Sequence, residues 1–430
     1  MKSMDNKKVV NAWAMYDWAN SVYPLVITST IFPIYYSAIT KNENSGFVDF
    51  FGRTYINTAL YSYAISLSFL VVALISPLLS GIADYSGNKK MFMRFFCYLG
   101  AISCSSLYFF VSGNIEFGII EFFLASVGFS GSLVFYNSYL PEISSPANQD
   151  KVSAKGYALG YIGSSILLIA SLALVLQPKL FGITDDSLPA RISFLLTGIW
   201  WIVFAQYSFR HLPSPTEKRI ATHHVILNGY RELIKVYQEI KTQSRLTSFL
   251  ISFFFFNMGV QTVMYVAALY GDKELKLESG QLITTILIIQ FVAIAGAYLF
   301  SFISSKLGNA KALAIAIIAW IGICLGALQV SNVQQFYTLA FFVGMVMGGI
   351  QSLSRSTYSK MLPETKDTTS YFSFFDVTDK MAIVLGTASY GLIEELTGSM
   401  KNSIGMLAIF FVIGLFFLFR IMKVNFTSIR

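Results

Sequence analysis

Histidine, cysteine and charge are all scarce in this chain of 430 residues. It has three histidines and three cysteines, and only 13 % of its residues are charged. His223 and His224 are adjacent but have no third ligand near them in the sequence, so no metal site is predicted. The chain also has no phosphate-binding glycine loop, no His-Glu-x-x-His motif and no nucleophile elbow. We therefore expect neither a cofactor nor an enzyme.

Apolar residues dominate instead, at 55 % of the chain, with 39 phenylalanines. A soluble protein averages about 25 % charged residues, so most of this surface is expected to face lipid. Cutting the chain at charged and Gly/Pro/Asn clusters leaves twelve apolar runs of the ~20 residues needed to span a bilayer. They are Val10–Ile39, Tyr55–Ile82, Lys90–Val111, Ile115–Leu140, Ser153–Leu176, Ile192–Phe209, Leu246–Tyr270, Gln281–Ser304, Ala310–Val330, Phe336–Tyr358, Tyr371–Leu396 and Ser403–Met422. We expect an all-α integral membrane protein.

The positive charges are distributed unevenly between the loops. The formal net charge is +8, and a cytoplasmic N-terminus places most Lys and Arg residues on the cytoplasmic side, as the positive-inside rule requires. The basic character therefore predicts topology rather than nucleic-acid binding. The first run carries Asp17, Trp18 and Asn20 where a signal peptide would have its apolar core, so no cleavable signal is predicted. We expect a multi-pass protein of the inner (plasma) membrane in a bacterial host, with both termini cytoplasmic.

The twelve runs divide six and six around a polar segment. The sequence predicts an N-terminal bundle over residues 1–209, a cytoplasmic linker over 210–245 and a C-terminal bundle over 246–430. Within the linker, apolar residues recur on one stripe from Val225 to Ile240, which predicts an amphipathic helix on the membrane surface. The halves also resemble each other, because YNSYLPE at 136–142 and YSKMLPE at 358–364 share Tyr, Leu, Pro and Glu at equivalent positions. Such internal symmetry is typical of transporters built from repeats.

A tight polar turn, GIADYSGNKK at 81–90, joins the second and third runs. It resembles the loop after the second helix of the major facilitator superfamily, G-x-x-x-D-x-x-G-x-[RK]-[RK]. The resemblance implies the major facilitator fold, with two six-helix pseudo-symmetric bundles and alternating access. It also assigns this loop to conformational control, so the predicted gate residues include Gly81, Asp84, Gly87, Lys89 and Lys90. The loop acid is expected to bridge to a helix of the opposite half.

Three further stretches resemble a narrower branch of that superfamily. They are AWAMYDWANS at 12–21, GYALGY at 156–161 and QSLSRS at 351–356. Together with the YNSYLPE segment they are similar to the autophagy-related vacuolar amino-acid effluxers and their bacterial relatives, the unknown-major-facilitator family. The resemblance covers most of the chain. It implies a secondary transporter, with amino acids as the favoured substrates.

Polar residues inside the predicted spans are candidates for substrate binding or coupling, because such groups are costly in a bilayer. Asp17 could bind a substrate ammonium group or carry a proton, or could instead pair with Lys155, Arg355 or Lys380. An arginine at 355 could receive a carboxylate or latch a gate. Asn257, Gln261 and Tyr265 share one helix face and could bind a zwitterion or join helices. The full candidate set is Asp17, Asn20, Tyr23, Glu121, Asn257, Gln261, Tyr265, Gln351 and Arg355.

A second set of charges is expected to form an inner gate. Asp376 and Lys380 are spaced i,i+4 and can pair along one helix, with Asp379 beside them. Arg94 and Glu142 could extend the contact made by the loop acid. The remaining predicted gate residues are Arg94, Glu142, Lys155, Asp376, Asp379 and Lys380.

The sequence thus favours a monomeric secondary transporter that moves a small polar solute, an amino acid or small peptide, with membrane lipid around it and protons as a candidate coupling ion. One alternative is a proton-driven exporter of amphipathic compounds, which predicts a more apolar site. A second is a membrane receptor that transports nothing, although the chain has no sizeable soluble domain for such a role.

Overall fold

The computed structural model describes residues 4–40, 47–214 and 225–427. Its first elements are α1 (Lys7–Asn20), η1 (Tyr23–Ile31), α2 (Phe32–Thr40), β1 (Phe47–Phe50), β2 (Arg53–Ile56), α3 (Asn57–Ser86), α4 (Lys89–Ser106), η2 (Leu107–Phe109), α5 (Ile115–Asn137), α6 (Leu140–Ile143), α7 (Gln149–Leu176), η3 (Pro178–Phe181) and α8 (Leu188–His211). They continue with α9 (Val225–Thr242), α10 (Ser244–Leu275), α11 (Ser279–Leu307), α12 (Asn309–Ala327), α13 (Val333–Met361), α14 (Thr368–Thr397) and α15 (Met400–Thr427). His223 and His224 lie outside the described residues.

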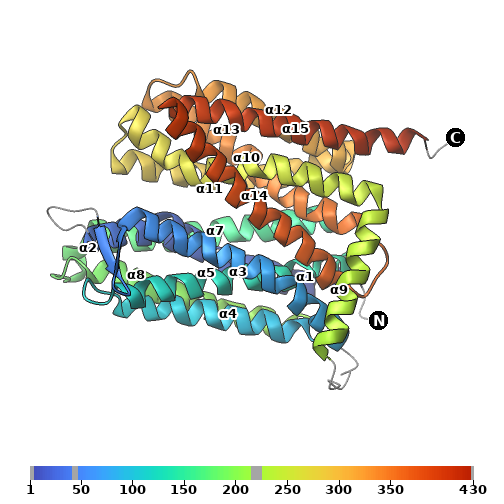
Figure 1. Ribbon diagram of the computed structural model, residues 1–430, viewed down its shortest axis with the longest axis horizontal. Helices are drawn as coiled ribbons and strands as arrows, with labels where there is room; N and C mark the ends of the chain where they lie inside the picture. Colours follow the sequence, from blue (N-terminus) through green and yellow to red (C-terminus); the bar gives the residue numbers. More distant parts are fainter. Residues whose placement is uncertain (1–3, 41–46, 215–224, 428–430) are drawn as a thin grey trace.

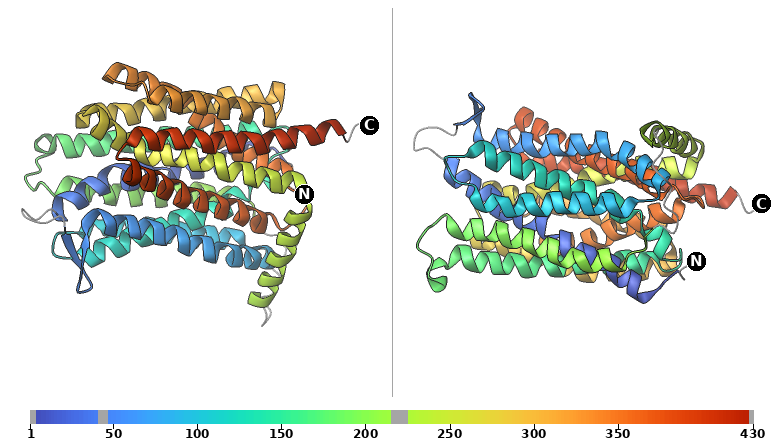
Figure 2. Two further views of the ribbon diagram at one scale, coloured as in Figure 1. Left: turned by 45° about the horizontal axis from the view of Figure 1, so that its top comes forward. Right: turned by 90° about the horizontal axis from the view of Figure 1, so that it is seen from below.

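Long helices lie roughly side by side in two groups, with α1–α8 on one side and α10–α15 on the other (Figures 1 and 2). One hydrophobic core is built from residues between Trp13 and Leu212, and the other mainly from residues between Val236 and Ile421. Helix α9 crosses one end of both groups, close to both chain termini (Figure 1). We call this the linker end, and the opposite end, with strands β1 and β2, the hairpin end.

Eleven segments of the described chain are long and apolar enough to cross a membrane. The predicted spans coincide with helices, and the eleventh is the one that is missing from these eleven segments. That span is α14, which has 30 residues but carries Asp376, Asp379, Lys380, Glu394 and Glu395. It packs against α10 on its own side and α3 on the other, and its Asp376 and Lys380 are buried. The twelve-helix fold is complete with α14 included.

The first span is one continuous segment, Lys7–Thr40, but it is not one regular α-helix. Residues Tyr23–Ile31 form a π-helix, with a proline in its first turn. Pro24 has no N–H to donate to the preceding turn, so the α-helical ladder is interrupted there. Within this segment the Thr30 hydroxyl donates to the Leu25 carbonyl, at 2.7 Å. A π-helical turn of this kind is often found at functional sites.

The second span begins later than predicted. Tyr55 was expected to start it, but Phe47–Phe50 and Arg53–Ile56 pair as an antiparallel hairpin and α3 begins at Asn57. The hairpin turn contains Phe51 and Gly52, both with positive φ. A turn of that kind lets two very short strands pair, and such strands leave little periodicity in the sequence to detect.

Glycines set the closest helix contacts at two places. A Cβ on Gly344 would lie 2.6 Å from the carbonyl oxygen of Ile289, so α11 and α13 pack closely only because the residue is glycine. At the linker end, a Cβ on Gly81 would overlap the backbone of Gly229. This second contact seats α9 directly on the end of α3, at the polar turn identified in the sequence.

Candidate functional site

A buried ion pair joins the two helix groups. The Arg355 guanidinium on α13 donates from Nη1 and Nη2 to Asp17 Oδ2 on α1, at 3.1 Å each. The two side chains are only 3 % and 7 % exposed. The Tyr136 hydroxyl donates to the same carboxylate oxygen at 2.7 Å. Of the three cations considered as partners for Asp17, the structure selects Arg355.

Aromatic rings and α7 complete the surroundings of Arg355. Its guanidinium lies 4.6 Å from the Trp13 ring centroid and 4.2 Å from that of Tyr157, so it is held by cation–π contacts. It also donates from Nε to Ser153 Oγ and from Nη2 to the Ser153 carbonyl, at 3.0 Å each. All five donors of a guanidinium are hard to satisfy in a low-dielectric interior, and this pocket provides partners from α1 and α7 together.

Gly156 on α7 makes room for this ion pair. A Cβ at that position would overlap Asp17 Oδ2 and would lie 2.9 Å from Arg355 Nη2. The GYALGY segment was noted for its resemblance to a family pattern, and the structure supplies a physical reason for its first glycine.

A second charged cluster lies on α14 and α10. The Lys380 ammonium contacts Asp379 Oδ2 at 2.8 Å and Asp376 Oδ1 at 3.2 Å. Asp379 Oδ1 accepts hydrogen bonds from Asn257 at 2.8 Å and from Gln261 at 3.3 Å. The structure thus brings two predicted binding residues together with three predicted gate residues.

Two tyrosines of α7 face α13. The Tyr157 ring lies against the Arg355 guanidinium. Tyr161, one turn further along α7, donates to Gln351 Oε1 of α13 at 2.7 Å. The i,i+4 spacing of these two tyrosines, which places them on one face of α7, was a usable signal in the sequence.

Further polar groups near these clusters are buried without a hydrogen-bond partner among the described residues. They include Asn20 Nδ2, Gln290 Oε1 and Thr262 Oγ1. Buried polar atoms are normally paired, so such atoms are where a bound solute or water can donate or accept. Tyr265, one of the predicted binding residues, remains 39 % exposed.

Three other candidates are placed elsewhere. Glu121 on α5 precedes Tyr136 by fifteen residues, or about 22 Å along the helix, and so lies towards the hairpin end. Lys155 donates to Asn11 rather than to Asp17. The Tyr23 ring packs 5.2 Å from Phe129.

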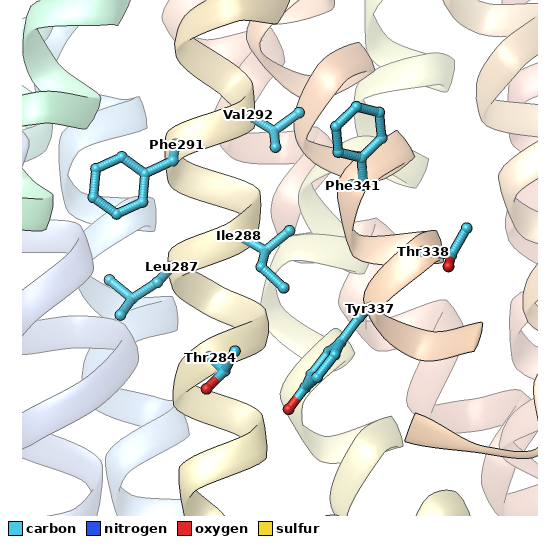
Figure 3. A pocket seen from close by; sticks show the side chains of 8 residues that line it. All are labelled: Thr284, Leu287, Ile288, Phe291, Val292, Tyr337, Thr338 and Phe341. Carbon is cyan, nitrogen blue, oxygen red and sulfur yellow. The ribbon is translucent and has the colours of Figure 1, made fainter. Parts of the chain in front are cut away.

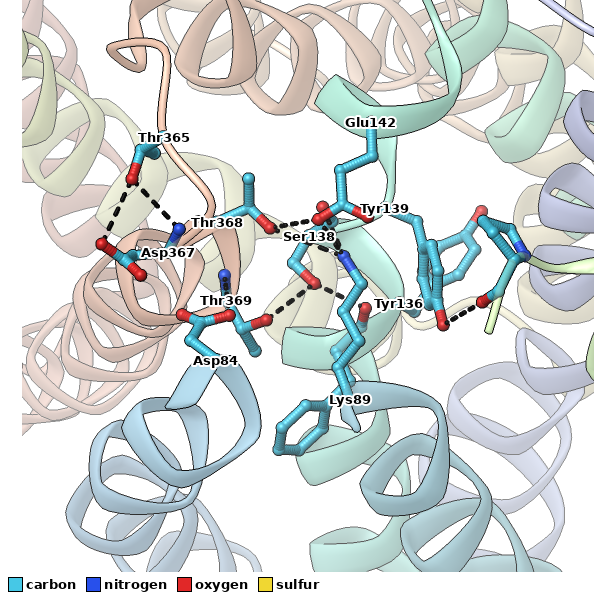
Figure 4. Close-up of polar contacts among 12 residues, drawn as sticks. Asp84, Lys89, Tyr136, Ser138, Tyr139, Glu142, Thr365, Asp367, Thr368 and Thr369 are labelled. Carbon is cyan, nitrogen blue, oxygen red and sulfur yellow. Dashed lines mark hydrogen bonds and ion pairs between the residues drawn. The ribbon is translucent and has the colours of Figure 1, made fainter. Parts of the chain in front are cut away.

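At the linker end, Asp84 caps a helix of the opposite group (Figure 4). Its two carboxylate oxygens accept the backbone N–H groups of Thr369, at 3.2 Å, and Ser370, at 2.6 Å. These are orphan donors in the first turn of α14, and a carboxylate there is favoured by the helix dipole. Gly87 ends α3 with φ of 68°, a left-handed conformation that glycine adopts without strain.

Lys89 and Glu142 extend this contact. The Lys89 ammonium pairs with Glu142 at 2.5 Å, and the Thr368 hydroxyl donates to the same carboxylate at 2.7 Å (Figure 4). Lys90 instead donates to the Leu212 carbonyl at 2.9 Å, within its own helix group. Arg94 likewise stays within that group, next to the Tyr98 and Phe209 rings, so the structure does not bring it to Asp84.

A third contact at the linker end was missed from the sequence. Asp150, at the start of α7, pairs with Lys360 of α13 at 2.7 Å. It also accepts from Ser304 at 2.6 Å and from Asn309 at 2.8 Å. Asn309 is the first residue of α12. In this contact a side-chain amide donates to the acid, whereas Asp84 accepts from backbone N–H groups.

The linker helix α9 joins the same end of α14. Lys235 contacts Glu232 at 2.8 Å and Asp367 at 3.1 Å, and these carboxylates raise the pKa of its ammonium above the ordinary value. The Tyr371 hydroxyl donates to Glu239 at 2.7 Å. The contacts of this end therefore come from both helix groups and from α9.

Comparison with known proteins agrees with this architecture. The family model described as "Vacuole effluxer Atg22 like" matches residues 5–425. An uncharacterized MFS-type transporter, YxiO, of Bacillus subtilis is 30 % identical over 95 % of this chain and 93 % of its own length. The autophagy-related protein 22 of Kluyveromyces lactis is 27 % identical over 85 % of this chain and 80 % of its own.

Solved structures of major facilitator transporters share the fold. FucP in the outward conformation superposes with a TM-score of 0.70 at 11 % identity, over 97 % of this chain and 99 % of its own. The organic anion transporter MFSD10 also gives 0.70, at 12 % identity, over 97 % of this chain and 100 % of its own. The chain therefore belongs to the Atg22-like family of major facilitator superfamily transporters and is not an enzyme.

Proposed function

We propose that this protein is a secondary transporter that moves a small polar solute, an amino acid or small peptide, by alternating access. The observation that carries the proposal is the polar boundary between the two helix groups. Lys380 and Asp379 supply both signs of charge, and Asn257 and Gln261 supply amides beside them. A zwitterion presents one group of each sign and can exchange with such partners. The family name, vacuole effluxer, is consistent with this class of substrate.

The linker end is assigned to the cytoplasm. It carries basic residues of the α1 start and of the 81–90 turn, which the positive-inside rule places there. The closed contacts of Asp84, Asp150 and Arg355 then lie on the cytoplasmic side. We infer that this conformation is closed to the cytoplasm and that these contacts must break in the transport cycle.

Counterflow in proteoliposomes tests the proposal. Vesicles containing the purified protein are preloaded with an unlabelled amino-acid pool, and entry of labelled amino acid is measured at equal pH on both sides. Saturable exchange above protein-free vesicles is expected. Absence of exchange for every amino acid and dipeptide offered, with the protein correctly inserted, would contradict the substrate class.

One observation favours the alternative of an exporter for amphipathic compounds. A groove of about 650 Å³ lies between α11 and α13 and is lined mainly by apolar side chains (Figure 3). Phe291 and Phe341 at its edge are 52 % and 45 % exposed. An apolar groove with exposed aromatic side chains at its edge suits compounds that partition into the bilayer. Inhibition of amino-acid counterflow by such compounds, or their own exchange in its absence, distinguishes the two functions.

A further inference from the structure

Within the transport function proposed above, we propose that the coupling ion is a proton and that it binds the carboxylate pair Asp376 and Asp379, at Asp376 Oδ2, rather than Asp17. The inference begins with charge balance. Asp376, Asp379 and Lys380 place two carboxylates against one ammonium, at 3.2 and 2.8 Å. With both acids ionised, the cluster carries one uncompensated negative charge.

The hydrogen bonds of the two carboxylates show which of them carries the uncompensated negative charge. Asp379 is fully engaged, because Lys380 contacts one oxygen and Asn257 and Gln261 donate to the other. Asp376 is only 4 % exposed, and its Oδ2 atom has no hydrogen-bond partner among the described residues. An ionised oxygen is strongly disfavoured in that position, whereas a protonated one is neutral.

The neighbouring elements supply no second cation. Lys380 lies 5.7 Å from the Phe69 ring of α3, and the titratable groups facing the cluster from α7 and α10 are Tyr157 and Tyr265. Within the described residues, no salt bridge joins the cluster to α3, α5, α9 or α15, the other helices packed against α14. A bound cation must therefore neutralise the uncompensated negative charge of the cluster.

A proton fits this site better than a metal ion. A sodium or divalent ion needs several oxygen ligands, and the Lys380 ammonium already occupies the other face of the Asp376 carboxylate. No group of three or more His, Cys, Asp or Glu side chains suited to a metal occurs in the described part of the chain. Protonation needs only the one free oxygen.

Asp17 lacks these properties. It forms a one-to-one pair with Arg355 and accepts a further hydrogen bond from Tyr136, so its charge is already balanced. The cluster on α14, in contrast, lies next to α3 of the opposite group, where opening and closing of the two groups changes its surroundings. A proton bound there can be exchanged with one side of the membrane at a time.

Infrared titration of the purified, detergent-solubilised protein tests the site without a substrate. The wild type is expected to show a carboxylic-acid C=O band that titrates with pH and disappears in Asp376→Asn. Asp379→Asn leaves Asp376 as the sole partner of Lys380, so the band is expected to disappear there too, which provides a second variant should the first fail to fold. Asp17→Asn is expected to retain the band. A band that persists in both α14 variants, is lost in Asp17→Asn, or is absent from the wild type overturns the proposal.

A transport readout follows once a substrate is known. In Asp376→Asn, counterflow at equal pH is expected to continue, while accumulation driven by a pH gradient falls to the equilibrium ratio of 1:1, as expected for uncoupled exchange. Accumulation that depends on sodium instead of the pH gradient would refute the proton assignment. Lack of counterflow in the wild type would contradict the substrate class, and the infrared result would still decide the proton site.

Discussion

Removing the charge of Asp17 is expected to open the linker end. In Asp17→Asn, Arg355 stays buried but loses its ionic partner. Removing one member of a buried, hydrogen-bonded ion pair typically costs about 3–5 kcal/mol. The pair joins α1 to α13, so the variant destabilises the conformation in which the linker end is closed. Since every 1.4 kcal/mol is a factor of ten, the closed state should lose roughly 10²- to 4 × 10³-fold in population relative to the open one.

Cysteine accessibility measures that shift. Ser138 is completely buried at the closed linker end, where Thr369 donates to its hydroxyl at 3.4 Å. In the described structure the native cysteines, Cys97, Cys104 and Cys324, are buried too. Ser138→Cys is therefore a nearly isosteric reporter, and its rate of labelling by a membrane-impermeant maleimide should rise strongly when Asp17→Asn is added.

The double variant Asp17→Asn/Arg355→Gln provides the control. It removes both charges, so no unpaired guanidinium remains, and much of the effect of the single variant should be reversed. Equal labelling of the reporter with and without Asp17→Asn would refute the reasoning. So would a double variant that labels faster than Asp17→Asn alone, because the cost could not then come from an unpaired charge.

Three other changes test the packing and the remaining contacts of the linker end. Gly156→Ala should lower the stability of the protein by about 1–3 kcal/mol through overpacking at the ion pair. Gly322→Ala is the control, because a Cβ at that position meets nothing within 4 Å, and it should not lower the stability. Thermal unfolding compares the two variants, and equal melting temperatures would contradict the packing argument. Asp84→Asn removes a charge worth about 0.3–1 kcal/mol at the α14 N-terminus, so reporter labelling should rise no more than about fivefold, and a larger rise would contradict this assignment. Asp150→Asn should also increase labelling, because Lys360 loses its ionic partner, and no increase would show that this contact does not hold the linker end closed.

The course of the backbone was largely predictable, because lipid imposes strong rules on sequence. Apolar runs of spanning length had to be helices, since backbone groups in hydrocarbon must be satisfied within the segment. The break in the first span at Pro24 was less accessible, since proline is tolerated in membrane helices when neighbours compensate. The β1–β2 hairpin was missed because four-residue strands hardly differ from the end of a spanning helix.

Pairings between the groups were harder to predict. The sequence left Lys155, Arg355 and Lys380 as possible partners for Asp17, and only the docking of α1 against α13 decides between them. The part of Trp13 in holding Arg355 was also hidden, because an aromatic residue in a spanning helix is usually in contact with lipid or core. The contact of Asp150 escaped detection because its partners, Ser304, Asn309 and Lys360, come from three helices that are far from it in the sequence.

The charges of α14 also bear on how the protein is made. Asp376, Asp379 and Lys380 would each oppose insertion of this helix as an isolated segment, since charged side chains near a bilayer centre cost roughly 2.5–3.5 kcal/mol each on insertion scales. In the folded protein their pairing and the amides of α10 remove much of that cost. Stable insertion of α14 into the membrane therefore depends on helices that are synthesised before it. A chain truncated to remove α10 should leave α14 outside the bilayer, so biogenesis of this span is a cooperative event.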